Sequence, residues 1–207
     1  MRFDNIEPSH KYLSDILSII REGITQKKAK LSKNNREGLN TQLLVETFNI
    51  IGTTNPQLKS WIGVQKEHER KNSMGREDIY FHLNDDNHTR IFYIEAKRLP
   101  KYKTKREEEY IFGEGVNGKK SGGIQRYKNL SHGDSNIRYN GMIAFIENQT
   151  VDDWLLLINN KLRKRYPNDL ELASNEYENE YVSVHKFEDH SEKSFTMHHF
   201  WINLQMK

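Results

Sequence analysis

The sequence contains no cysteine, no linker rich in proline or glycine, and no long apolar run. The absence of cysteine excludes disulfides, thiolate zinc sites and cysteine nucleophiles, and it makes a cytosolic location the default. The longest strongly apolar stretch, WLLLI at 154–158, is far shorter than the ~20 residues of a membrane span. Acidic residues also lie where a signal peptide would need an apolar segment. We therefore expect a cytoplasmic protein without membrane contact.

What the chain does contain suits one folded domain. Only 35% of its 207 residues are apolar, but 9 Phe, 10 Tyr and 3 Trp supply enough large side chains for a core. The 32 Lys and Arg against 29 Asp and Glu leave a net charge of +3, which decides nothing about nucleic acid. We expect a single domain over 1–207. In it, 1–36 form a helix and a basic connector, 37–146 the core, and 147–207 a C-terminal helix with a β-hairpin extension.

The predicted elements mix helices and strands. Apolar residues at helical spacing predict helices at 9–21, 37–51, 122–130 and 151–166. Runs of aromatic and β-branched residues predict strands at 60–70, 77–83, 90–99, 139–146, 181–187 and 195–204. Gly23 is a stop signal for the first helix, and Thr150 with Asp153 predicts a cap on the last. The charged segment 100–123 is expected to be a long mobile loop. The fold class is α/β, with a central mixed β-sheet flanked by helices.

The second and third predicted strands form a hairpin that brings two carboxylates together. Side chains alternate along a strand, so Glu95 and Lys97 share a face about 7 Å apart at ~3.4 Å per residue. With the turn centred between Asp86 and Asn87, antiparallel pairing sets Asp78 directly opposite Glu95. The Cβ atoms of such a pair lie ~4.5–5.5 Å apart.

This pair of acids with a lysine has a specific chemical use. Two carboxylates that close repel each other when both are ionised, so a proton or a cation must neutralise them. A hard divalent cation does so, with oxygen ligands at ~2.0–2.1 Å for Mg²⁺. Lys97 would then lie beside the ion, where it can orient a water or steady charge on a phosphate. The competing interpretation is a solvent-facing Glu/Lys pair on a half-exposed sheet.

Asp78, followed by Glu95-Ala96-Lys97 at the end of the next strand, resembles the PD-(D/E)XK nuclease superfamily, the fold of many restriction endonucleases. The resemblance covers roughly 37–146 and implies a restriction-endonuclease-like αβββαβ core. It also implies a nuclease that depends on Mg²⁺, and Mn²⁺ can take the place of Mg²⁺. Asp78 and Glu95 would be metal ligands together with the carbonyl of Ala96, and Lys97 the catalytic lysine. Glu77 stands where the family name has proline, a position that varies often.

Two further residues are candidates for the catalytic set. Glu46 lies on a mostly apolar helical face, and in the family a helix acid often joins the metal site; the alternative is that it reaches solvent. Gln125 corresponds to a polar position on the helix after the catalytic strands in several branches of the superfamily; the alternative is an ordinary surface position. Glu67 and Glu69 could assist in place of Glu46.

Several basic and aromatic residues are open to a role in nucleic-acid binding. The glycines before Gln125 leave backbone N–H groups suited to phosphate, and Arg126 and Lys128 could add charge while Tyr127 stacks on a base. The loop lysines can either reach a phosphate backbone or stay solvated; they are Lys119 and Lys120. The cations at 161–165 are expected to complement the dipole of their helix. Adjacent His198 and His199 point to opposite strand faces, which argues against zinc.

The sequence therefore predicts a metal-dependent endonuclease that hydrolyses the phosphodiester bonds of DNA, with RNA not excluded. We expect it to act in bacterial restriction or phage defence, as a homodimer or with a partner subunit of a defence system. Two alternatives stay open, a non-catalytic nucleic-acid-binding module and a protein-interaction subunit that retains the nuclease fold. Salt-dependent DNA binding separates the last of these from the others, because phosphate contacts release counterions.

Overall fold

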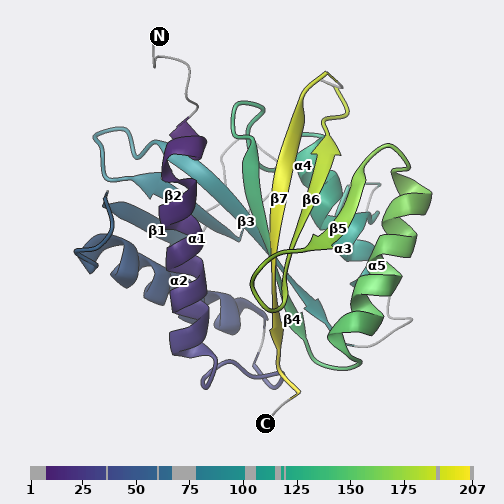
Figure 1. The fold of residues 1–207 in the computed structure, drawn as a ribbon, viewed down its shortest axis with the longest axis horizontal. Coiled ribbons are helices and arrows are strands. Elements are labelled where there is room, and N and C mark those ends of the chain that lie inside the picture. The colour runs from purple at the N-terminus through teal and green to yellow at the C-terminus, as the bar shows by residue number, and fades with distance from the viewer. Residues whose placement is uncertain are drawn as a thin grey trace.

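The computed structural model describes residues 8–35, 37–59, 61–66, 78–100, 106–114, 118, 120–189 and 192–205. The strands of these residues form one seven-stranded sheet in the order β1-β2-β3-β4-β7-β6-β5 (Figure 1). The sheet contains both parallel and antiparallel pairs, which confirms the predicted α/β class with a central mixed sheet. No helix within the described ranges is long and apolar enough to cross a membrane.

Two helices precede the sheet, α1 (Pro8–Lys27) and α2 (Glu37–Thr54). The prediction that α1 stops at Gly23 is wrong, because the helix continues one further turn to Lys27. A Cβ atom on Gly23 would lie only 2.3 Å from Cδ1 of Phe48, a fully buried ring of α2. Gly23 therefore serves close contact between the two helices, and its packing role outweighs its low helix propensity.

The first three strands form an antiparallel meander, β1 (Ile62–Lys66), β2 (Ile79–Leu83) and β3 (Arg90–Leu99). The β2–β3 ladder pairs Ile79 with Ile94, which is the predicted register, and it ends there, so that Asp78 directly precedes the paired residues. The register shifts nearer the turn, at a bulge that leaves the pairing around Ile79 unchanged.

The segment between β3 and β4 contains two short helices, α3 (Arg106–Ile111) and α4 (Gly123–Lys128). The prediction of a loop over 100–123 is therefore wrong for its described part, since Tyr110 of α3 is fully buried. The charged residues before Tyr110 hide the apolar period of so short a helix. Strand β4 (Tyr139–Ile146) has the predicted bounds and runs parallel to β3.

The last elements complete the sheet on its far side, and they are α5 (Val151–Arg165), β5 (Leu170–Ser174), β6 (Glu180–Lys186) and β7 (Ser194–Asn203). The predicted cap of α5 is confirmed, because Thr150 Oγ1 accepts from the backbone N–H of Asp153 at 3.1 Å and the Asp153 side chain bonds back. The sequence prediction omitted β5, an edge strand whose one buried residue, Leu172, gives no alternation.

The sheet separates two hydrophobic clusters. Phe92, Ile94 and Ala96 of β3 pack in the cluster that contains the buried residues of α1 and α2. Tyr93 and Leu99 of β3 pack in the other, with residues of α3, α4 and α5. From Phe92 onward this is the predicted alternation, and it directs Glu95, between Tyr93 and Lys97, to the α4 side of the sheet.

Candidate functional site

The Glu95 carboxylate is almost fully buried and meets three basic side chains. Lys97 Nζ lies 2.5 Å from Oε1 and extends from the same strand. Arg126 of α4 donates from Nη1 to the same oxygen at 2.8 Å. His132, in the segment after α4, places Nδ1 3.0 Å from Oε2, close enough for an ion pair but without the alignment of a hydrogen bond. One carboxylate therefore contacts side chains from three places in the chain.

These contacts decide the charge states of Glu95 and Lys97. Burial alone would raise the pKa of the Glu95 carboxyl, because the charged form loses its water. The charge of Lys97, the contact with His132 and the charge of Arg126 outweigh burial and hold this pKa well below its ordinary value. Burial would lower the pKa of the Lys97 ammonium, yet the charges of Glu95 and Asp78 raise it. Both groups are therefore charged at neutral pH.

Asp78 lies against β3 where the predicted register places it. It directly precedes β2 and is half-buried, and its Oδ2 accepts a hydrogen bond from the backbone N–H of Ala96 at 2.7 Å. Its charge also acts on Lys97, whose pKa it raises. The structure thus brings together Asp78, Glu95, Ala96 and Lys97, the set that the sequence selected for metal binding and catalysis.

Glu46 does not join this group by any described contact, and its exposed side chain matches the alternative in which it reaches solvent. Its side chain is exposed, and Gln42 Nε2 donates to its Oε1 at 2.9 Å. Helix α2 buries Leu44, Val45 and Phe48 in the first cluster, so Glu46 lies outside the apolar stripe. Among the described contacts, none connects it to Glu95. Two of the weaker candidates, Glu67 and Glu69, lie outside the described residues.

Gln125 is neither a surface residue nor a neighbour of Glu95 by any described contact. Its side chain is buried, and Oε1 accepts from the backbone N–H of Gly113 at 3.2 Å and of Gly122 at 3.4 Å. It therefore connects the start of α4 to the segment that follows α3. The sequence predicted that the backbone N–H groups here would be available to a phosphate. The structure shows the Gly122 N–H donating to Gln125 instead.

The residues after Gln125 differ in what they can reach. Tyr127 is buried in the second cluster, so it cannot stack on a base. Lys128 is also buried and donates to Asp169 Oδ2 at 2.6 Å, which removes it from phosphate binding. Lys120 is exposed and pairs with Glu188 at 2.6 Å, whereas Lys119 lies outside the described residues. Of the three α4 residues proposed for nucleic acid, only Arg126 is both partly exposed and at the site.

His132 is the site residue that the sequence did not reveal. Its ring is completely buried, and its backbone N–H donates to the carbonyl of Arg126 at 3.0 Å. This turn after α4 returns the chain to Glu95. A single histidine in a polar turn, SHGD, carries no periodic signal, so its burial beside Glu95 could not be recognised from the sequence.

The carboxylates of Asp78 and Glu95 are the kind of oxygen ligand that a small hard cation takes. Glu95 Oε2 is buried without an aligned hydrogen-bond donor, and Asp78 adds a half-buried carboxylate that contacts the backbone N–H of the next residue, Ala96. Within the described residues, no three His, Asp or Glu side chains converge as a complete metal-ligand group. A Mg²⁺ site does not need three such side chains, because Mg²⁺ is usually bound by one or two carboxylates together with waters and substrate phosphates.

A second buried polar cluster lies between the sheet and the α3 side. Ser183 Oγ is hydrogen-bonded to His185 Nε2 at 2.7 Å and to His199 Nε2 at 2.8 Å. His185 Nδ1 contacts Asp169 Oδ2 at 2.9 Å, and Tyr110 Oη contacts His199 Nδ1 at 2.7 Å. Ser183, His185 and Asp169 have the contacts of a catalytic triad, but Ser183 is buried between two imidazoles, where no substrate can reach it.

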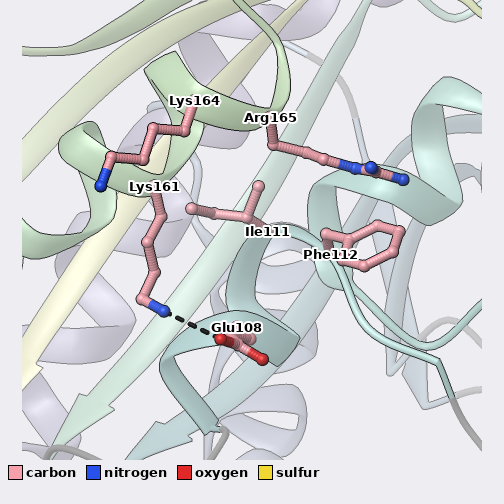
Figure 2. Close-up of a pocket in the computed structure, with 6 residues that line it drawn as sticks. All are labelled: Glu108, Ile111, Phe112, Lys161, Lys164 and Arg165. Atoms are coloured by element: carbon pink, nitrogen blue, oxygen red, sulfur yellow. Dashed lines mark hydrogen bonds and ion pairs between the residues drawn. The ribbon is translucent and has the colours of Figure 1, made fainter.

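A hollow of about 280 Å³ lies between α3 and α5, lined by three cations of α5 (Figure 2). Two of these cations have partners on the α3 side. Lys161 Nζ pairs with Glu108 at 3.0 Å, and the Arg165 guanidinium lies 3.8 Å from the centroid of the Phe112 ring. These contacts, together with the position of Arg165 in the last turn of α5, agree with the expected structural role of these cations.

We compared the chain with protein-family models, with curated proteins and with solved structures, and none of the three comparisons finds a match. The resemblance to the PD-(D/E)XK nucleases therefore stays a prediction. It depends on Asp78 and on Glu95-Ala96-Lys97, whose side chains the fold has now placed.

Proposed function

We propose that the protein is a metal-dependent nuclease of the PD-(D/E)XK type that hydrolyses the phosphodiester bonds of DNA. The observation that carries this proposal is the placement of Asp78 against the backbone of Ala96, beside an ionised Glu95 and a protonated Lys97. The chain order α2, β1, β2, β3, α4, β4 supports the finer assignment to a restriction-endonuclease-like αβββαβ core, although α3 is inserted before α4.

Each residue has a distinct part in the proposed reaction. Asp78 and Glu95 would hold Mg²⁺ or Mn²⁺, with the carbonyl of Ala96 as a further oxygen ligand. Once bound, the cation supplies positive charge to the attacking water and to the phosphate oxygens. Lys97 donates hydrogen bonds to the water or to a phosphate oxygen, and it stays protonated because Glu95 and Asp78 raise its pKa. His132 limits the movement of the Glu95 carboxylate from the buried side.

The direct test is cleavage by the purified protein. We expect it to nick or cut DNA with Mg²⁺ or Mn²⁺, to be inhibited by EDTA, and to cut little with Ca²⁺, whose looser coordination positions water less tightly. Lys97→Ala should lose most of this activity, roughly 100-fold or more, as for the loss of a group that stabilises the transition state. Its fold should persist, because Glu95 keeps Arg126 and His132 as partners. Asp78→Asn should lose activity and also weaken metal binding.

The matched control is Lys161→Ala, which removes an ion-paired lysine on α5 and should cut like the wild type. Cleavage that persists undiminished in both Lys97→Ala and Asp78→Asn would contradict the proposal. The same assay should be run with RNA as the substrate. It should also be run on DNA with the products of neighbouring genes added. Cleavage of RNA alone would correct the substrate class.

A further inference from the structure

Arg126 occupies the carboxylate that the proposed metal ion needs. Its Nη1 atom and Lys97 Nζ both contact Glu95 Oε1, at 2.8 and 2.5 Å. The other oxygen, Oε2, lies against the ring of His132. A carboxylate offers about four lone-pair directions, so three basic neighbours leave little room for a cation at 2.0–2.1 Å. At least one neighbour has to move before Glu95 can bind a metal ion.

Arg126 is the neighbour most able to move. Its side chain is 23% exposed, compared with 13% for Lys97 and 0% for His132. The backbone of α4 is held by buried residues on both sides of Arg126, and these are Gln125 and Tyr127. The guanidinium has one other described contact, a long hydrogen bond to the carbonyl of Lys120 at 3.4 Å. The side chain can therefore swing outward while α4 stays in place.

The charges at the site favour this movement when substrate arrives. Arg126 and Lys97 contact the same oxygen of Glu95, so their two positive charges lie close together and repel each other. A divalent ion on the same carboxylate would add a third positive group within a few ångströms, at a Coulomb cost that burial increases. A phosphate removes the conflict, because a guanidinium binds phosphate oxygens through two parallel hydrogen bonds.

We propose that Arg126 exchanges Glu95 for a phosphate of the substrate, and that this exchange opens Glu95 to the metal ion. Metal ion and nucleic acid then bind cooperatively, since each favours the conformation in which Arg126 has left Glu95. By linkage, the factor by which DNA raises the affinity for metal equals the factor by which metal raises the affinity for DNA. The inference rests on the proposed function, and it makes Arg126 a positioning residue that keeps the site closed without substrate.

Calorimetric titration of the full chain with Ca²⁺, with and without a DNA duplex, tests the exchange without cleavage. We expect DNA to raise the Ca²⁺ affinity of the wild type. Arg126→Gln should bind Ca²⁺ roughly tenfold more tightly without DNA, and DNA should then add little, in the usual range for linked sites. The matched control is Arg163→Gln, which also removes one arginine charge and one carboxylate pair, with Glu171 at 2.7 Å, but on α5. Its Ca²⁺ affinity should equal that of the wild type.

The outcomes separate this inference from the proposed function through Glu95→Gln. If Glu95→Gln weakens Ca²⁺ binding but Arg126→Gln leaves it unchanged or weaker, the metal site stands and the exchange is wrong. If Glu95→Gln binds Ca²⁺ like the wild type, the ion is not at Glu95, and both proposals fall. Arg126→Lys keeps the charge, so its Ca²⁺ affinity should lie nearer the wild type than that of Arg126→Gln. The reverse order would contradict the exchange even if Arg126→Gln folds poorly.

Discussion

Glu95 shows how one buried charge organises a site. Its carboxylate faces Lys97, Arg126 and His132, and without such partners a buried carboxylate would take up a proton. The same contacts keep Lys97 protonated, so each charge of the pair depends on the other. Removal of one group of this set therefore leaves the charges of the others uncompensated.

Glu95→Gln should destabilise the protein as well as inactivate it. The substitution leaves the cations of Lys97 and Arg126 close together without their shared counter-ion, and the loss of one partner from a buried ion pair costs about 3–5 kcal/mol. Because both cations retain some exposure, we expect a value near the lower end. Urea denaturation measures it, with Glu46→Gln as the control at an exposed acid. Equal stability of both variants would show that the Glu95 contacts do not support the fold.

At the scale of elements, the contact between α1 and α2 depends on the absence of a side chain. Gly23 lets the Phe48 ring approach the α1 backbone, and Phe48 packs in the cluster that contains buried residues of β1, β2 and β3. Helix α1 therefore keeps a residue of low helix propensity well inside its last two turns, because the packing it permits contributes more than the propensity costs.

Gly23→Ala should lower the free energy of unfolding by roughly 1–3 kcal/mol, the usual cost of overpacking a core. This result would be opposite to helix propensity, which favours alanine by about 1 kcal/mol. Gly38→Ala in α2 is the control, because its added Cβ would meet only Lys66 Nζ, at 3.5 Å. Thermal and urea unfolding measure both variants. A Gly23→Ala variant as stable as Gly38→Ala would mean that α1 and α2 separate readily to accommodate the methyl group.

At the scale of the whole molecule, the second buried polar cluster connects α3 to the far strands of the sheet. It is a chain of hydrogen bonds through Ser183 that runs from Tyr110 to Asp169. When both imidazoles are neutral, His185 Nδ1 donates to the Asp169 carboxylate and His185 Nε2 accepts from the Ser183 hydroxyl. Ser183 Oγ then accepts from His199 Nε2, and His199 Nδ1 accepts from Tyr110. Ser183, His185 and His199 then each donate once and accept once, in a single direction.

The buried histidines make stability depend on pH. Burial lowers the pKa of His185 and His199, and it lowers that of His198 to about 4. Between about 4 and the ordinary value near 6.5, the unfolded chain therefore binds more protons than the folded one. Stability is fully present above about pH 6.5 and falls as the pH drops below it, by up to ~1.4 kcal/mol per pH unit for each histidine.

Urea denaturation at pH 7.5, 6 and 5 measures this slope. The His198→Gln variant should take up about one proton fewer on unfolding in this pH range, because it removes a histidine whose pKa burial lowers to about 4. The substitution should have little effect on the free energy of unfolding at pH 7.5, and its main effect should be on how steeply that free energy falls with pH. A wild-type stability that stays constant from pH 7 to pH 5 would show that the folded chain takes up as many protons as the unfolded chain. The pKa values of these histidines would then not be lowered by folding.

The sequence by itself determined the features that depend on neighbours along the chain. The polar turn and the alternation of the flanking strands set the hairpin register, so the approach of Asp78 to β3 beside Glu95 could be predicted. Thr150 and Asp153 are three residues apart and define the start of α5 through their mutual hydrogen bonds. In each case the residues that give the signal are close together in the chain, so local backbone geometry is enough to predict how they are placed.

Only the tertiary structure decided which distant segments meet. Nothing periodic distinguishes Arg126 or His132, yet they complete the surroundings of Glu95, more than 30 residues away in the chain. The direction of Glu46, the packing role of Gly23 and the parallel pairing of β7 with β4 were equally absent from the pattern. Such contacts depend on how helices and strands pack across the sheet, and a residue carries no local signal of a partner that reaches it only through the fold.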